Sequence, residues 1–225
     1  DLPPVDYVLS PAFATESLTL LQGEPKSGKS CFALLCAIAV ATGKWTAGRW
    51  HVPRRRKVLF MTWEDGPRRL KRRILEYCRG LGIAVPDNLV VYSHKDAPHL
   101  QLETAEGRAF LTEIVAMHKP ELVILDTLSY LHAVKESEAH EMKPVITALR
   151  DLARDQACSV GVIHHTKKIG KGDTSGVAYK SRGSSAIAAG PDCIIDWGNP
   201  IQDVTLVRFL SKDDDSDEFN VLYEA

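Results

Sequence analysis

The sequence has few of the features that mark secreted or membrane-bound proteins. Its 225 residues include five cysteines, and no two of them form a Cys-x-x-Cys pair. Four of the five lie inside apolar runs, so we expect buried thiols in a reducing cytoplasm rather than a disulfide framework. No signal peptide is visible, and the longest apolar run, residues 31–42, is too short to span a membrane. We therefore expect a cytoplasmic protein with no membrane partner.

A marked net charge is also absent. The formal net charge is −1 and the pI is about 6.8, so a surface that binds nucleic acid must be local. What remains is the composition of an ordinary globular protein, with 44% hydrophobic and 25% charged residues. A chain of this length buries a sufficient core without disulfides or metals. The chain starts with aspartate rather than methionine, and we expect it to be a fragment of a longer protein.

Apolar runs alternate with helical patterns along most of the chain. The expected strands are Leu18–Gln22, Val58–Thr62, Leu89–Tyr92, Leu122–Leu125, Ser159–His164, Cys193–Trp197, Val204–Leu210 and Phe219–Tyr223. The expected helices are Gly28–Thr42, Pro67–Leu81, Ala105–Lys119, Met142–Gln156, with Pro144 in its first turn, and Ser184–Ala189.

The strand–helix order predicts an α/β fold in one domain, residues 1–225. Several strands, such as "LVIL" and "VLFM", are continuous apolar runs, which is typical of parallel strands buried by helices on both faces. The last two strands are separated only by the acidic segment "SKDDDSDE". We expect these two strands to pair as a C-terminal antiparallel hairpin.

The stretch "GEPKSGKS", residues 23–30, matches the phosphate-binding pattern G-x-x-x-x-G-K-[ST] at every fixed position. Glycines in such a loop let backbone N–H groups surround phosphate oxygens, and the following helix presents its N-terminus to them. The strand before and the helix after the loop make a chance match improbable. The predicted nucleotide-binding residues are Gly23, Glu24, Pro25, Lys26, Ser27, Gly28, Lys29, Ser30 and Cys31.

A metal site is expected beside this loop. Asp126 ends the buried strand of "ELVILDTLSYL", and a carboxylate there can hold a Mg²⁺-bound water. The hydroxyl of Ser30 can bind Mg²⁺ directly. If it stood alone, Asp126 would be interpreted as the cap of a turn. Beside the phosphate-binding loop at 23–30, called the P-loop, a metal-binding role is favoured. The expected cofactors are ATP and Mg²⁺, with Lys29 reaching the β- and γ-phosphates.

The position of the catalytic carboxylate distinguishes subclasses of ATPase. In AAA+ ATPases it directly follows the metal-binding aspartate, but here Thr127 follows Asp126 and cannot act as a base. Instead, "VLFMTWEDG" places Glu64 and Asp65 at the tip of the strand after the P-loop helix. We predict that Glu64 orients the attacking water, as in RecA-like ATPases. Asp65 is the rival, or a cap of the helix that starts at Pro67; both acids could also be caps.

Two histidines end the strand "VGVIHHTKK". Strand alternation sends His164 and His165 to opposite faces, so one of them is expected in the core. We predict that His165 senses the γ-phosphate. No cysteine or carboxylate lies at zinc-ligand spacing from either residue.

Taken in order, "GEPKSGKS", "WEDGPRRLKRRI", "ELVILDTLSYL", "VIHHTKK" and "RGSSAIAAGPD" resemble the RepA-like ATPases of the RecA/DnaB superfamily. The resemblance covers about residues 18–212. It implies a RecA-like P-loop core, ATP hydrolysis at the interfaces of a homo-oligomer such as a hexamer, and single-stranded DNA near the axis. Family members are often attached to primase-like domains, so a primase-like partner or fused domain is a further expectation.

The sequence departs from the family where a neighbouring subunit should supply a cation. The stretch after "RGSS" reads "AIAAGPDC" and has no arginine, and "FLSKDDD" has Asp214 where DnaB-type helicases carry arginine. Fast hydrolysis in such motors needs a cation that stabilises the transferring phosphoryl group. Arg182 and Lys212 remain as the trans-acting candidates.

A basic, glycine-rich segment follows the sensor strand at 164–183. It has five basic residues and one acid, and in RecA-like proteins this loop faces DNA. Flexible lysines suit sequence-independent phosphate contacts. The clusters "RRRK", 54–57, and "RRLKRR", 68–73, are further basic segments, the second more consistent with a solvated or interface face. The predicted DNA-binding residues are Lys167, Lys168, Lys171, Lys180 and Arg182.

Three functions are compatible with these features. The first is a Mg²⁺-dependent ATPase acting on single-stranded DNA, as a RepA-like helicase subunit. The second is an ATP-controlled regulator, recombination mediator or loader of the KaiC or RadA type, favoured by the missing arginine. The third is a small-molecule kinase, against which stand Glu64, the paired histidines and the absence of an obvious lid.

Overall fold

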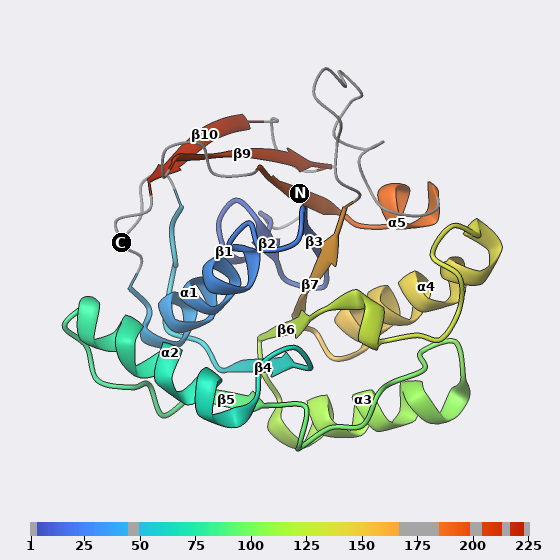
Figure 1. Ribbon diagram of the computed structural model, residues 1–225, viewed down its shortest axis with the longest axis horizontal. Helices are drawn as coiled ribbons and strands as arrows, with labels where there is room; N and C mark the ends of the chain where they lie inside the picture. The colour runs from blue at the N-terminus through green and yellow to red at the C-terminus, as the bar shows by residue number, and fades with distance from the viewer. Residues whose placement is uncertain (1–3, 45–49, 167–184, 199–203, 213–216, 223–225) are drawn as a thin grey trace.

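The computed structural model describes residues 4–44, 50–166, 185–198, 204–212 and 217–222 (Figure 1). An eight-stranded sheet runs through its centre in the order β10-β9-β8-β3-β7-β6-β4-β5. The strands from β8 to β5 are parallel, and β9 and β10 are antiparallel to their neighbours. The strand bounds are Leu18–Gly23 (β3), Val58–Thr62 (β4), Leu89–Tyr92 (β5), Leu122–Asp126 (β6), Ser159–His165 (β7), Cys193–Trp197 (β8), Val204–Ser211 (β9) and Asp217–Leu222 (β10).

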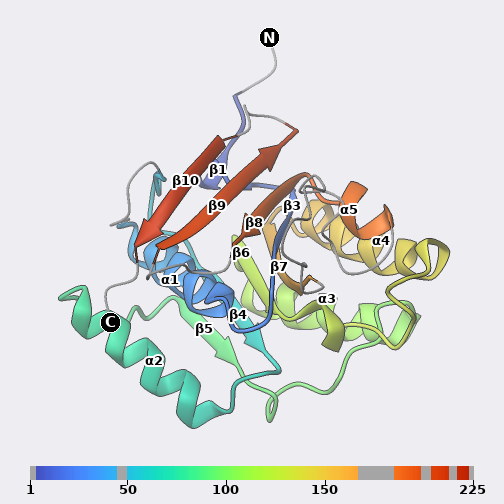
Figure 2. The same ribbon diagram turned by 45° about the horizontal axis from the view of Figure 1, so that its top comes forward.

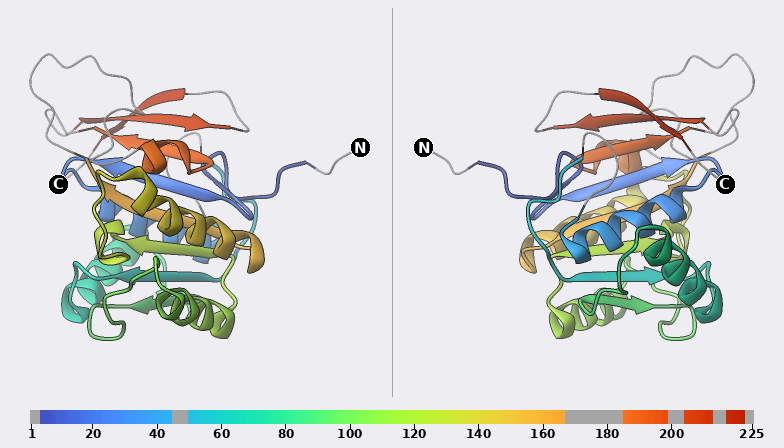
Figure 3. Two further views of the ribbon diagram at one scale, coloured as in Figure 1. Left: turned by 90° about the vertical axis from the view of Figure 1, so that its right-hand side faces the viewer. Right: turned by 90° about the vertical axis from the view of Figure 1, so that its left-hand side faces the viewer.

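Helices cover both faces of the sheet, as the views in Figures 2 and 3 show. Helices α1 and α2 pack with one cluster of buried side chains, and α3, α4 and α5 pack with the other. None of the helices in the described residues is long and apolar enough to cross a membrane. The helix bounds are Lys29–Thr42 (α1), Pro67–Gly80 (α2), Ala105–His118 (α3), Ala139–Asp155 (α4) and Ser185–Ala189 (α5), with a 3₁₀ turn, η1, at Leu128–Tyr130.

The predicted α/β class and the C-terminal antiparallel hairpin are confirmed. Helix α4 differs from its prediction: it begins at Ala139, so Pro144 lies in the second turn. The prediction relied on the preference of proline for the first turn. The buried stripe of Met142, Val145 and Leu149 holds the helix around the proline. A short ribbon of β1, Tyr7–Leu9, and β2, Phe13–Ala14, was not expected, because such short strands show no periodicity.

Strand order places the functional tips side by side. The P-loop follows β3, and β7 lies between β3 and β6. Strand β6 lies between β7 and β4, and Asp126 of β6 is opposite Thr62 of β4. Since the carboxyl ends of parallel strands meet at one edge of a sheet, the residues at the ends of β3, β7, β6 and β4 converge there.

Candidate functional site

The phosphate loop connects the end of β3 to the N-terminus of α1. Gly28 is the N-cap of α1 and has a φ of 98°, a left-handed conformation that favours glycine. At Gly23, an added Cβ would lie 2.2 Å from the carbonyl oxygen of Trp197 on the neighbouring strand β8. Both glycines of the motif are therefore required by local geometry, one by its backbone conformation and one by close approach.

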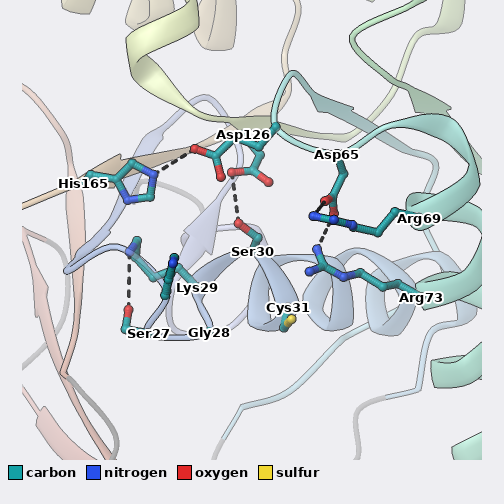
Figure 4. A pocket seen from close by; sticks show the side chains of 12 residues that line it. Ser27, Gly28, Lys29, Ser30, Cys31, Asp65, Arg69, Arg73, Asp126 and His165 are labelled. Carbon is teal, nitrogen blue, oxygen red and sulfur yellow. Dashed lines mark hydrogen bonds and ion pairs between the residues drawn. The ribbon is translucent and has the colours of Figure 1, made fainter.

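Lys29 lies inside the loop and is almost fully buried. Its Nζ donates hydrogen bonds to the carbonyl oxygens of Gly23 and Glu24, at 2.9 and 2.6 Å, and approaches Ser27 Oγ at 3.4 Å (Figure 4). Burial lowers the pKa of Lys29 to about 8, although Asp126 and Glu64 act in the opposite direction. The ammonium is therefore mostly charged at neutral pH and is already placed at the start of α1, where anions bind.

Ser30 and Asp126 form an oxygen pair beside the loop. Ser30 Oγ lies 3.2 Å from Asp126 Oδ1 (Figure 4). Thr62 Oγ1 lies 3.3 Å from Asp126 Oδ2. Burial raises the pKa of Asp126 to about 7, helped by the negative charge of Glu64 and opposed by the two hydroxyl hydrogen bonds. A divalent cation would favour the ionised carboxylate by direct attraction.

Glu64 follows β4 at the same edge and is hydrogen-bonded to His165 at the end of β7, with 2.9 Å between Glu64 Oε1 and His165 Nε2. This hydrogen bond lowers the pKa of Glu64, against the effect of its partial burial, and Lys29 adds to the lowering. Glu64 is thus a carboxylate at neutral pH. The neighbouring His164 is buried, as expected for one of the two histidines, and it does not line the cavity.

Asp65 forms ion pairs with arginines of α2 and does not cap that helix. It does not cap α2, because the N-cap is Gly66 and no side chain caps that helix. Its buried carboxylate is instead bonded to Arg69 and Arg73 on the first turns of α2 (Figure 4). The two arginines satisfy both oxygens of Asp65, which leaves Glu64 as the acid that faces the loop and His165.

These groups line one cavity of about 400 Å³. Of the predicted nucleotide-binding residues, 26–31 line the cavity, whereas Gly23, Glu24 and Pro25 do not. The cavity thus joins the P-loop to the candidate metal, water-orienting and sensor residues. The other lining residues are Glu64, Asp65, Arg69, Arg73, Asp126 and His165.

Sequence reasoning missed several contributors to this site. Arg69 and Arg73 belong to a cluster interpreted as a solvated or interface face, yet both line the cavity. Their spacing of four residues places them on one side of α2, and the nearby Asp65 was the signal that could have shown which side. Thr62 and Trp197 carry no motif. Their roles depend on strand order, which cannot be read from one strand at a time.

Other predicted residues lie away from the cavity or outside the described residues. Lys212 follows β9 and is 3.1 Å from Asp192, at the end of the sheet opposite the P-loop. The arginines of the "RRRK" cluster each bond to carboxylates: Arg54 to Glu121, Arg55 to Asp87, and Arg56 to Asp6 and Glu121. The three arginines of the cluster are therefore paired with carboxylates within the fold. Lys167, Lys168, Lys171, Lys180 and Arg182 lie outside the described residues.

The residues present fit a magnesium–nucleotide complex better than a metal held by protein alone. Within the part of the chain that the structure describes, no group of three or more His, Cys, Asp or Glu could hold a metal ion. Mg²⁺ in nucleotide sites is held by one or two protein oxygens together with substrate phosphates and waters. The adjacent oxygens of Ser30 and Asp126 match that requirement, and the P-loop lies directly beside them.

Comparisons with known proteins agree with this geometry. A family model described as "AAA domain" matches residues 1–171. A solved structure, described as "The Structure Of A DnaB-Like Replicative Helicase And Its Interactions With Primase", matches with a TM-score of 0.71 at 13% sequence identity. The match covers 93% of this chain and 57% of that chain, so this chain spans little more than half of its length.

At this identity the structural match concerns the fold alone. It confirms the RecA-like α/β arrangement predicted from the ordered motifs. The family model covers well over half of the 225 residues. The chain therefore belongs to the AAA domain family, and its RecA-like P-loop fold is similar to that of the DnaB-like replicative helicase structure.

Proposed function

We propose that this chain is a Mg²⁺-dependent ATPase that acts on single-stranded DNA in the cytoplasm, as a RepA-like helicase subunit. The observation that carries the proposal is the arrangement at the sheet edge. Glu64, bonded to His165, shares one cavity with the phosphate loop and with the Ser30–Asp126 pair. This combination supports nucleotide hydrolysis rather than nucleotide binding alone.

The chain's own residues would bind the phosphates in three ways. Backbone N–H groups of the loop, from Glu24 and residues 26–30, and the α1 N-terminus would surround the oxygens. Lys29, held at the start of α1, contributes a charge that is mostly present at neutral pH. Ser30 and Asp126 would hold Mg²⁺, which, when bound, neutralises charge on the β- and γ-phosphates.

Glu64 would orient the attacking water. Its depressed pKa keeps it ionised, so it can accept a hydrogen bond from water. His165 donates to Glu64 in this structure, and a γ-phosphate would compete for the same imidazole N–H. His165 would thus sense the γ-phosphate and release Glu64 toward water when ATP is bound. Thr127 cannot replace Glu64, since its hydroxyl donates to the Ile163 carbonyl at 2.6 Å.

The test is the Glu64→Gln variant, measured for ATP binding and for ATP turnover. Binding should persist, because the P-loop is intact, and kcat should fall by about 10²- to 10⁴-fold. Glu113→Gln changes an exposed glutamate on α3 in the same way and serves as the matched control. Asp65→Asn tests the rival acid and should cost less than about tenfold. Unchanged turnover in Glu64→Gln would overturn the assignment.

Assembly and DNA binding form a further part of the proposal. Motors of this kind take a cation for their site from a neighbouring subunit. We propose a homo-oligomer, a hexamer in the first instance, with single-stranded DNA bound by the basic segment after His165. A primase-like partner or fused domain is part of the same proposal. Mass measurement with a non-hydrolysable ATP analogue tests it: a monomer under all conditions would contradict the ring.

One observation favours a second candidate, the ATP-controlled regulator or loader. Lys212, one of the two trans-acting candidates, is bonded to Asp192 of its own chain. A subunit without a free trans-acting cation would hydrolyse ATP slowly and act as a switch. Strand displacement on a forked duplex separates the two candidates, since a loader has none.

A further inference from the structure

The tip of β8 carries a tryptophan directly beneath the phosphate loop. Trp197 is 1% exposed and is among the largest fully buried side chains. Strand β8 pairs with β3 in parallel, with Trp197 opposite Gly23, the first residue of the loop. No motif marks this residue, and it is not a lining residue of the nucleotide cavity.

Three contacts connect Trp197 to the loop and to α1. Its indole N–H donates to the carbonyl oxygen of Ser27 at 2.6 Å. Its ring lies against Phe32 of α1, with centroids 4.4 Å apart. Its own carbonyl occupies the space that a side chain at Gly23 would need. One residue therefore contacts the start of the loop, its middle and the helix that follows.

Asp196, the residue before Trp197 in β8, contacts β3 on the opposite face of the sheet. Gln22 Nε2 lies 3.3 Å from Asp196 Oδ1, and both side chains are buried. Because side chains alternate along a strand, Asp196 and Trp197 bond to β3 and its loop from the two faces of the sheet. The P-loop is thus tied to β8 on both sides of its first residue.

The Ser27 contact matters because of how a phosphate loop works. Its backbone N–H groups must point inward to bind an anion, so carbonyl groups point outward and need donors of their own. A buried carbonyl without a partner would favour rotation of its peptide unit away from this geometry. The indole N–H supplies the donor to Ser27 and restrains the peptide units on either side of it.

We propose that Trp197 is a positioning residue that holds the P-loop in its phosphate-binding shape and so sets nucleotide affinity, without taking part in hydrolysis. The proposal rests on the nucleotide site proposed above. It predicts that a change at Trp197 affects ATP binding and leaves the rate of hydrolysis nearly unchanged. Loss of the indole N–H should weaken ATP binding, while kcat at saturating ATP stays nearly the same, because Glu64 and His165 are untouched.

The experiment compares Trp197→Phe with the wild-type chain for ATP dissociation constant, KM, kcat and unfolding free energy. Phenylalanine keeps an aromatic ring against Phe32 and removes the N–H. We expect the dissociation constant and KM to rise about tenfold, the effect of losing one buried hydrogen bond, with kcat within about twofold. Affinity within twofold of wild type would overturn the proposal.

Trp63→Phe is the matched control. Trp63 is also buried, and its indole N–H also donates to a backbone carbonyl, that of Pro98 at 2.9 Å; neither residue lines the nucleotide cavity. Its variant loses the same bond and a similar volume, so ATP affinity should stay within about twofold of wild type. An equal loss of affinity in both variants would show general loosening and would contradict a specific role of Trp197.

A measurement on the unmodified chain covers the case in which Trp197→Phe does not fold. The indole N–H resonance of Trp197 should shift in the ¹H–¹⁵N spectrum when ATP binds. An unshifted Trp197 signal at saturating ATP would overturn the positioning role. Failure of wild type to bind ATP at all would instead overturn the proposed nucleotide site, so the two failures are distinguishable.

Discussion

Replacing Asp126 by asparagine is expected to stabilise the metal-free chain against unfolding, although the residue is assigned to the metal. The carboxylate is 1% exposed, and its pKa rises from 3.8 to about 7 through burial and the nearby Glu64. The folded state therefore binds the proton more tightly than the unfolded state. The contribution of this protonation to the free energy of unfolding is fully present below about pH 4, and it is lost as the pH rises through about 7.

The size of the effect follows from the shift in pKa. A difference of about three units corresponds to about 4 kcal/mol between full protonation and full ionisation, at about 1.36 kcal/mol per unit. About 2.5 kcal/mol of this is lost between pH 5 and pH 8. Asparagine has nearly the same shape, keeps an oxygen that can accept from Ser30, and carries no charge. The variant should therefore gain about 2.5 kcal/mol relative to wild type over this interval.

Urea denaturation of both proteins in EDTA, at pH 5 and pH 8, measures this change directly. For a chain of this length it corresponds to about 5–10 °C in Tm. Asp87→Asn, at a carboxylate that is 84% exposed, is the control and should show a nearly constant difference from wild type. If the difference between Asp126→Asn and wild type did not change with pH, the buried carboxylate would not carry the cost inferred from the structure.

Two further variants probe the scaffold. Gly23→Ala should lose most ATP affinity and about 1–3 kcal/mol of unfolding free energy, since its Cβ would lie 2.2 Å from the Trp197 carbonyl oxygen; calorimetry of unfolding and of ATP binding checks both, and wild-type affinity would contradict the close approach. Arg56→Met should cost about 1–3 kcal/mol in urea denaturation, because a buried guanidinium bonded to Asp6 and Glu121 is removed while both acids keep access to water; an unchanged midpoint would contradict this.

The elements could be predicted because their signals are local. The apolar runs that became β4 and β5 have the predicted bounds, and the loop–helix junction at Gly28 follows from its motif. The order of the strands could not be derived from these runs. In that order β7 lies between β3 and β6, and β4 follows β6. His165 at the end of β7 therefore comes within hydrogen-bond distance of Glu64 after β4.

Side-chain partners were harder to predict than positions. The sequence placed Glu64 and Asp65 together at a strand tip but could not say which one faced the P-loop. That depends on Arg69 and Arg73, which reach back from α2 to Asp65. The "RRRK" cluster shows the same limit: its charge is clear in the sequence, but its carboxylate partners come from three other segments of the chain. Charge patterns alone do not distinguish a binding surface from a neutralised one.

We propose that this site hydrolyses ATP and that single-stranded DNA governs the rate. Steady-state ATP turnover with Mg²⁺, measured with and without single-stranded DNA, tests it most directly. We expect turnover that depends on Mg²⁺, rises with single-stranded DNA, and is lost in Glu64→Gln while ATP still binds. ATP binding without turnover, at every concentration of single-stranded DNA, would contradict it.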